Sequence, residues 1–297
     1  MEAKDWTTVS FEEGRRTLKQ WREESVRRSE EVVELWEHVI SREASSLGDE
    51  LWIVYEQVLI GALDCYRLDM VKECVDALKR QFPSSQRVMR LQAMALEAEE
   101  KYDEALECYD RLIKKDETNT SVRKRKVAVL LARGERGDAI KELVEYVKVF
   151  LNDNEAWLQL SACYLAEGEM GRAAHCVEEL ILAQPLNHLY HQRYADVRYT
   201  QGGTDNVELA KHHYAQAAKL NPANARALYG LLLSCAWLCS KSSGQKKKDL
   251  LSLATWAGEK LVQKYQSEGQ TNPNVDVHVE TVENMLNSLK AASASSA

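Results

Sequence analysis

The chain has 297 residues, of which 45% are hydrophobic and 29% charged, and its formal net charge is −7. This length buries a sizeable core, and four prolines and three phenylalanines are typical of a helical globular protein rather than a disordered one. The acidic balance argues against a general binder of nucleic acid or of anionic membranes, which would carry an excess of basic residues.

Residues 1–48 are predicted to form a helical cap at the N-terminus. Ser10 and Glu13 have the spacing of a capping box, and the helix that follows carries Phe11, Leu18 and Trp21. A second helix over 29–44 would place on one side Val32, Val33, Trp36, Val39 and Ile40. The tryptophans fit a cover for the end of a repeat array, and the alternative is an element that docks a partner.

A period of 34 residues then runs through the chain. It is carried by three kinds of residue: Gly134, Gly168 and Gly202; Ala105, Ala139 and Ala173; and, three periods apart, Pro83 and Pro185. Three residue types in one register predict tetratricopeptide (TPR) repeats, each a pair of antiparallel helices. We therefore predict an all-α, right-handed α-solenoid of about five to six TPR-like helix pairs, with N- and C-terminal capping helices.

The solenoid is expected over 49–266. Its units lie near 49–83, 86–119, 120–153, 154–187, 188–224 and 225–266. In the clearest unit, 154–187, Trp157, Leu160 and Tyr164 are expected to pack one helix on the other. Ser161 and Ala173 are small because the helices cross closely there, and Pro185 closes the second helix.

Three units depart from the period. We predict an enlarged turn between the helices of the first unit, a three-residue insertion in the turn 201–206 of the fifth, and a polar basic loop over 240–248 in the sixth. The remaining segment, 267–297, is predicted to contain a linker over 267–274, a last helix and a frayed tail from 291. The apolar stripe of that helix is Val279, Val282, Met285, Leu286 and Leu289.

The sequence predicts neither a signal peptide nor a transmembrane helix. The first residues are charged where a signal peptide needs an apolar core. The most apolar run, 227–239, would reach only ~20 Å as a helix, short of the ~30 Å hydrocarbon core of a bilayer. We expect it to be a buried helix.

The sequence lacks the common patterns of catalysis and metal binding. The sequence contains no P-loop and no HExxH motif. His188 and His191 are one helical turn apart and His212 and His213 are adjacent, but no cysteine or carboxylate completes a metal set. The seven cysteines lack a CxxC pair and are predicted to be reduced thiols in the core; only Cys235 and Cys239 have a spacing that allows cooperation. We expect neither an enzyme nor a cofactor.

Candidate binding residues lie on the concave surface, which TPR modules build mainly from positions 2, 5, 9 and 12 of the first helix of each pair. Modules that clamp the carboxylate tails of chaperones carry asparagine at position 9, whereas this chain has Met94, Ala128, Ala162 and Asp196. A groove that is basic in its N-terminal half and apolar in its middle suits an extended or helical segment of another protein. The candidates are Arg87, Arg90, Gln192, Asp196, Tyr199, Arg226 and Tyr229.

A basic run at Arg123, Lys124 and Arg125, continued by Lys126, begins the third unit, and Lys79 and Arg80 lie near the end of the first. It is interpreted either as a solvated helix start or as a docking patch for an acidic or membrane-proximal partner. We favour a protein partner over lipid, because no lipid-facing helix accompanies the run.

Several segments are more specific than the repeat pattern. They are QWREES at 20–25, LGDELWIVYEQV at 47–58, LKRQFP at 78–83, TNTSVRKRK at 118–126 and NHLYHQRYADVRYTQGG at 187–203. Together they resemble the subunit 2 family of the endoplasmic reticulum (ER) membrane protein complex, over nearly the whole chain. Glu117, where the family pattern is proline-like, and the extreme termini depart from it.

The resemblance implies a non-catalytic scaffold on the cytoplasmic face of the ER membrane, attached peripherally through protein partners. These would be the cytosolic segments of membrane subunits and a peripheral cytosolic subunit, in a machine that inserts tail-anchored and weakly hydrophobic transmembrane segments. Nucleic acid is not an expected partner. The alternative is a free TPR adaptor or co-chaperone that binds soluble partners.

Overall fold

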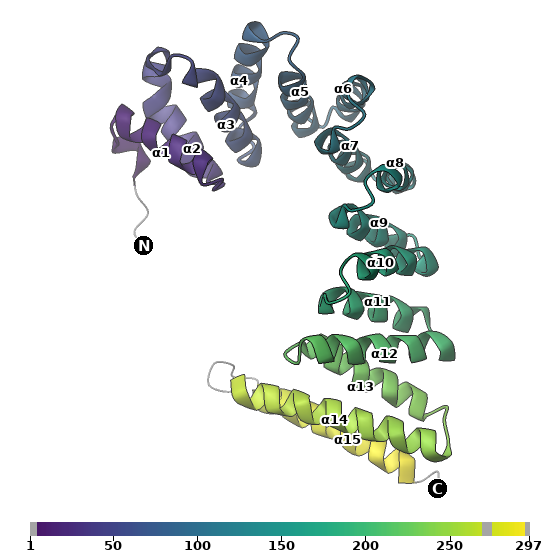
Figure 1. The fold of residues 1–297 in the computed structure, drawn as a ribbon. Helices are drawn as coiled ribbons and strands as arrows, with labels where there is room; N and C mark the ends of the chain where they lie inside the picture. Colours follow the sequence, from purple (N-terminus) through teal and green to yellow (C-terminus); the bar gives the residue numbers. More distant parts are fainter. Residues whose placement is uncertain (1–4, 269–274, 295–297) are drawn as a thin grey trace. The chain divides into compact units, whose positions relative to one another are not determined.

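The regular structure of the described residues is entirely helical. The computed structural model describes residues 5–268 and 275–294. Its helices follow chain order, and those within residues 29–132 and within 154–294 each pack against the next (Figure 1). They are α1 (Phe11–Glu23), α2 (Ser29–Leu35), α3 (Glu50–Asp64), α4 (Leu68–Gln81), α5 (Gln86–Ala98), α6 (Tyr102–Lys115), α7 (Thr120–Ala132), α8 (Arg136–Val149), α9 (Asn154–Ala166), α10 (Met170–Ala183), α11 (His188–Gln201), α12 (Thr204–Leu220), α13 (Ala225–Cys239), α14 (Gly244–Glu268) and α15 (Val275–Ala294). The predicted all-α class is confirmed.

The chain divides into two compact units, Met1–Glu142 and Leu143–Ala297. The boundary lies inside α8. One buried cluster of the first unit is built from α1 to α5, and one of the second unit is built from α11 to α15. Each unit therefore has a core of its own.

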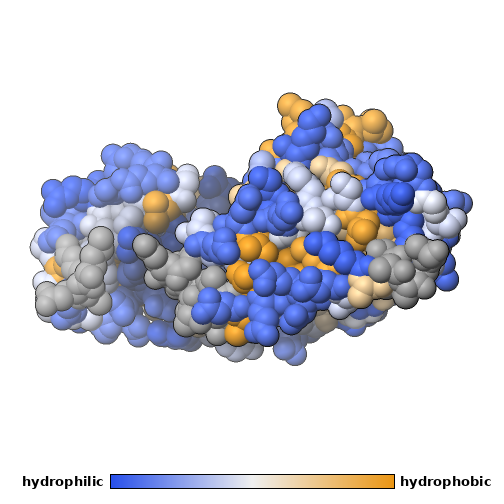
Figure 2. Space-filling model, turned by 90° about the horizontal axis from the view of Figure 1, so that it is seen from below, coloured by the Kyte–Doolittle hydropathy of each residue, from blue (hydrophilic) through white to orange (hydrophobic). Residues whose placement is uncertain are grey.

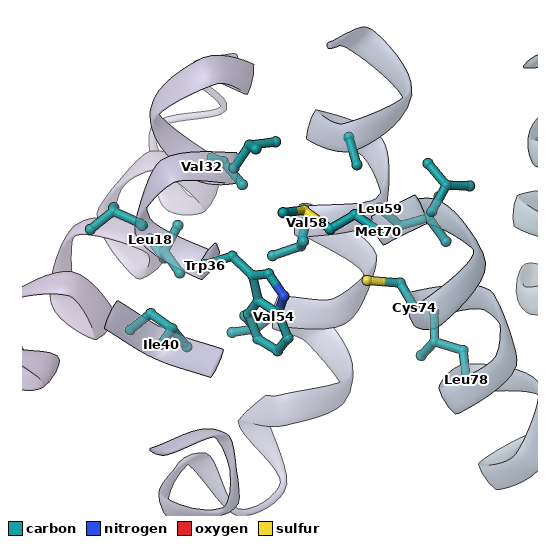
Figure 3. Close-up of a cluster of buried hydrophobic side chains, with 14 of the residues drawn as sticks. Leu18, Val32, Trp36, Ile40, Val54, Val58, Leu59, Met70, Cys74 and Leu78 are labelled. Atoms are coloured by element: carbon teal, nitrogen blue, oxygen red, sulfur yellow. The ribbon is translucent and has the colours of Figure 1, made fainter. Parts of the chain in front are cut away.

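The N-terminal helices contribute to the buried cluster of the first unit, and α1 begins as predicted. The Ser10 side chain accepts a hydrogen bond from the Glu13 backbone N–H at 3.3 Å. Leu18 of α1 and Val32 of α2 point into a core that α3 and α4 complete with Val54 and Cys74 (Figure 3). Burial raises the pKa of the Cys74 thiol to about 12, so this thiol is inert packing rather than a nucleophile.

The second predicted helix is not continuous. α2 ends at Leu35, a π-helical turn follows over Trp36–Ile40, and a 3-10 segment covers Ser41–Leu47. Every apolar residue from 32 to 40 is buried, and on a regular α-helix they would cover about half of the circumference, more than a surface helix usually buries. The wider π-turn occurs where Trp36 and Ile40 both enter the core.

The turn of the first repeat is not enlarged, contrary to the prediction. Three residues separate α3 from α4, as they separate α5 from α6 and α9 from α10. Tyr66 and Glu100 have left-handed φ values of 56° and 58°, and Gly134 and Gly168 take the same role with φ of 79° and 76°. These positions are 34 apart, so the extra residues belong to α3, which has 15 residues against 13 in α5. The enlarged turn was predicted because Trp52 was aligned with Trp157, whereas Tyr55 is the residue that lies three periods of 34 before Trp157.

The insertion in the fifth repeat lengthens a helix rather than the turn. Only Gly202 and Gly203 separate α11 from α12, with φ of 75° and 83° that reverse the chain in two residues. The Asn206 amide donates to the Gly202 carbonyl at 2.9 Å and secures the start of α12. α12 has 17 residues where α10 has 14, so the inserted residues are helical.

The predicted basic loop of the sixth repeat is also shorter. α13 ends at Cys239 and α14 begins at Gly244, so Lys246, Lys247 and Lys248 are helical. The last helix is α15, and its predicted stripe is correct, since Val282 and Leu286 are buried against α14. The predicted linker starts later than 267 because α14 extends to Glu268; residues 269–274 and the last part of the predicted tail, 295–297, lie outside the described residues.

The central repeat packs as its residue pattern predicts. Trp157, Leu160 and Tyr164 are buried. Ser161 is fully buried, and its hydroxyl donates to the Ala173 carbonyl at 3.1 Å across the contact between α9 and α10. A small side chain is required here both because the helices cross closely and because the hydroxyl must reach the facing backbone.

The cysteines are unpaired, as predicted. All seven are free, and all except the half-buried Cys65 are buried. Cys235 and Cys239 lie on one face of α13, where burial raises the pKa of the Cys235 thiol to about 12 and also raises that of Cys239. Neither has the lowered pKa of a reactive thiol.

Candidate partner-binding site

A cleft of about 640 Å³ opens in the first unit among α3, α5 and α7. Its charged lining consists of Arg27, Asp64, Arg90, Glu97 and Arg125, and its apolar lining includes Leu63 and Met94. The cleft thus brings together Arg90, a predicted groove residue, and Arg125 of the predicted basic run. We call this the N-terminal cleft.

Most charges of the N-terminal cleft are paired internally. The Arg27 Nε donates to Asp64 at 2.7 Å, and the Arg125 Nη1 donates to Glu97 Oε2 at 3.1 Å. The Tyr109 hydroxyl donates to the other oxygen of Glu97. Burial raises the pKa of Glu97, against the lowering effects of Tyr109 and Arg125. Arg90 is the exception, because its buried Nε has no hydrogen-bond partner in the described part of the chain.

The other predicted basic residues do not line this cleft. Arg87 makes a bidentate pair with Glu56 at 2.8 and 2.7 Å, and Lys79 and Arg80 are exposed at the end of α4. Arg123 is half-buried, and its Nε and Nη1 have no partner among the described residues. Lys126 lies 2.9 Å from both Asp110 and Glu142. The basic run is therefore partly used for internal pairing, and a docking role for Lys124 and its neighbours stays a prediction.

A second cleft, of about 600 Å³, lies in the second unit among α9, α11 and α13. We call it the C-terminal cleft. It is lined by Leu158, Leu165, Leu189, Tyr190, Gln192, Arg193, Asp196, Val197, Thr200 and Arg226. Of the predicted groove residues it unites Gln192, Asp196 and Arg226 on an apolar floor.

The predicted polar residues of the C-terminal cleft are already satisfied. The Asp196 carboxylate accepts the Tyr214 hydroxyl at 2.6 Å and the Arg226 Nε at 3.0 Å. Burial, followed by the hydrogen bond to Asp196, raises the pKa of Tyr214. The Gln192 oxygen accepts the Asn224 amide at 2.8 Å. These contacts hold α11 against α12 and α13, so they position the cleft and leave little free bonding capacity.

Tyr199 and Tyr229 do not belong to this lining. Both are half-buried and pack against the buried cluster of the second unit. The ring of Tyr229 lies 6.5 Å from that of Tyr265, and burial raises its pKa. Their place in the fold points to a packing role, and a binding role for either stays a prediction.

Arg193 is a cleft residue that the sequence reading missed. Its Nε is buried, and Arg193 makes no hydrogen bond or ion pair with the described residues. The 34-residue period could have identified it, because Arg193 lies two repeats after Arg125 and Leu165 lies two repeats after Glu97. Where the N-terminal cleft has an internal carboxylate, the C-terminal cleft has a leucine.

The histidines form a pair, but across two helices rather than within one. His191 Nδ1 lies 3.0 Å from His213 Nδ1, and His191 Nε2 lies 2.9 Å from the Pro185 carbonyl. A carbonyl only accepts, so a neutral His191 donates from Nε2 and receives the Nδ1–H of His213. Burial, and secondarily His191, lowers the pKa of His213 to about 4.

We expect mild acid to destabilise the second unit through His213. Its pKa is lower in the folded than in the unfolded chain, so the effect is absent above pH 6.5 and grows as the pH falls toward 4. At pH 5 the loss is about 2 kcal/mol of unfolding free energy. Urea unfolding at pH 7.5 and 5 should show that H213Q, which still donates to His191, reduces this loss.

The matched control is H212Q, because His212 is adjacent and exposed. That variant should keep the acid sensitivity of the parent. Equal pH dependence of H213Q and H212Q would contradict the assignment.

The described residues contain neither a group of potential metal ligands nor a helix that could span a membrane. Within 5–268 and 275–294, no three His, Cys, Asp or Glu side chains are grouped so as to hold a metal ion. Over the same ranges, every helix is too short or too polar to cross a bilayer.

Comparison with known proteins relates the chain to one family. Residues 70–206 match the family described as the EMC2 TPR-like repeat domain. The chain is 46% identical to ER membrane protein complex subunit 2-A of Xenopus laevis, over 96% of this chain and 97% of that protein. It is 31% identical to ER membrane protein complex subunit 2 of Dictyostelium discoideum, over 87% and 85%.

Among solved structures, the C-terminal part of a TPR repeat-containing protein from Cytophaga hutchinsonii is similar in fold. It superimposes with a TM-score of 0.61 at 12% identity, over 91% of this chain and 99% of that one. At this identity the likeness concerns the fold alone, and it agrees with the repeats found here.

Proposed function

The chain belongs to the family of subunit 2 of the ER membrane protein complex, and we propose that it is a non-catalytic scaffold of that complex. Its partners would be the other subunits, whose cytosolic segments it holds at the cytoplasmic face of the ER membrane. Through them it would take part in inserting tail-anchored and weakly hydrophobic transmembrane segments. The similarity to the Xenopus laevis subunit over nearly the whole of both chains carries this proposal.

Exposed apolar side chains support a scaffold role. Leu182 and Leu186 are exposed at 75% and 78%, and Trp256 of α14 and Val277 of α15 at 42% and 60%. Figure 2, seen from below, shows apolar residues gathered between polar ones on one face of the molecule. Large exposed apolar patches usually mark surfaces that another protein covers.

Extraction of membranes tests the peripheral attachment. Alkaline carbonate should release the chain from ER membranes without detergent, because only protein contacts hold it there. Mild detergent should instead recover it together with membrane subunits of the complex. Retention after carbonate would argue against peripheral attachment, and recovery with chaperones but no ER membrane subunits would favour a free TPR adaptor.

A further inference from the structure

The C-terminal cleft contains a cation without an internal counter-ion. The Nε of Arg193 is buried, and the residue makes no hydrogen bond or ion pair with the described part of the chain. A buried donor without an acceptor is unfavourable, and more so when it carries charge. The equivalent Arg125 meets Glu97 at 3.1 Å in the N-terminal cleft. Arg193 instead faces a cleft in which Leu165 occupies the position of that glutamate.

The remaining lining defines what else a ligand must bring. Leu158, Leu165 and Leu189 make the floor apolar, and Leu189 is exposed at 54%. The carboxylate of Asp196 is neutralised by Arg226, so it does not compete for Arg193 as a counter-ion. The ligand therefore needs apolar side chains for the leucines and a carboxylate for the guanidinium.

We propose that the C-terminal cleft binds a leucine-rich segment of a partner protein that carries an acidic side chain, which pairs with Arg193. The inference deepens the proposed scaffold function, on which it rests, by assigning one of its docking sites. A protein segment fits better than a nucleic acid, since the cleft is apolar and the chain has a net charge of −7. The cleft volume of about 600 Å³ accommodates several side chains.

Two labelled peptides test the chemistry. Both have leucine at helical spacing of three and four residues; one carries glutamate beside the leucines and the other glutamine in its place. The glutamate peptide should bind the full chain roughly tenfold more tightly, because a charge-assisted bidentate contact replaces a neutral one. Equal affinities, or no binding of the glutamate peptide at millimolar concentration, would overturn the proposal.

Variants of the cleft distinguish a pairing of Arg193 with the peptide glutamate from a general effect of charge on peptide binding. R193Q should remove the preference for glutamate without unfolding the chain, because Arg193 has no described internal partner to lose. L165E should recreate the Glu97–Arg125 arrangement inside the cleft and weaken the glutamate peptide by a similar factor. K219Q, an equal loss of charge at an exposed position of α12, should leave both affinities at the values of the parent chain. A preference that survives in R193Q would refute the role of Arg193.

Three further outcomes would identify another occupant of the cleft or show which of the two proposals is wrong. Concentration-dependent dimers of the full chain that disappear in R193Q would show that a second copy fills the cleft, against the proposal. If R193Q loses the preference for the glutamate peptide but no ER membrane subunit co-purifies with the parent chain, the binding site is supported and the scaffold function is contradicted. If membrane subunits co-purify but the parent chain binds both peptides equally, only the binding site is contradicted.

Discussion

Replacement of Gly230 by alanine is expected to lower the free energy of unfolding of the second unit by about 3 kcal/mol. An ideal Cβ at Gly230 would lie 2.4 Å from the ring of Tyr214, far inside van der Waals contact. The ring cannot yield easily, because Tyr214 is 3% exposed and its hydroxyl is bonded to Asp196. To make room for the added methyl group, either α12 and α13 must separate or the hydrogen bond from Tyr214 to Asp196 must break.

Gly171 of α10 offers the matched control. It is also helical, but a Cβ there would meet nothing within 4 Å, and G171A should be neutral or stabilise by up to about 1 kcal/mol. Urea unfolding followed by far-UV circular dichroism compares the two alanines directly. Similar midpoints for G230A and G171A would contradict the tight contact. Since Tyr214 also holds Asp196, G230A should in addition weaken peptide binding in the C-terminal cleft.

The repeat period predicted the fold well because each of its positions has one physical task. Gly168 needs a left-handed φ of 76°, and Ser161 must be small where α9 meets α10. The departures from the period were harder to predict, because inserted residues can extend a helix as easily as a turn. Tyr66 takes the left-handed role without being glycine, which hid the register of the first repeat. The π-turn in residues 36–40 has no sequence signal that we can name.

The binding residues were less predictable than the helices. Fixed groove positions placed Gln192, Asp196 and Arg226 in the C-terminal cleft, yet their polar groups are bonded to Asn224, Tyr214 and one another. Whether a charged side chain is free depends on its neighbours on two other helices, and the groove position of a residue within its own repeat gives no information about them. Comparison of the same position in successive repeats gives part of this information. It shows that Arg125 has a glutamate where Arg193 has a leucine.

Reversal of one charge in the basic run is expected to destabilise the first unit before it disturbs any docking. In R125E the new carboxylate would face Glu97, whose side chain is 16% exposed and whose pKa burial already raises. Arg125 itself is 42% exposed, so solvent screens part of the repulsion, and we expect a loss of about 2 kcal/mol of unfolding free energy. K72E, an exposed reversal on α4, should cost only a few tenths of that value.

A neutral pair separates stability from docking at this site. E97Q combined with R125Q keeps a hydrogen-bonding pair and removes the two opposite charges, so its urea midpoint should lie close to that of the parent. If the basic run docks an acidic partner, this stable variant and K124E should both reduce recovery of the complex in detergent. Unchanged recovery with both would leave the run as internal pairing and solvated surface. An R125E variant as stable as K72E would show that Glu97 does not depend on Arg125.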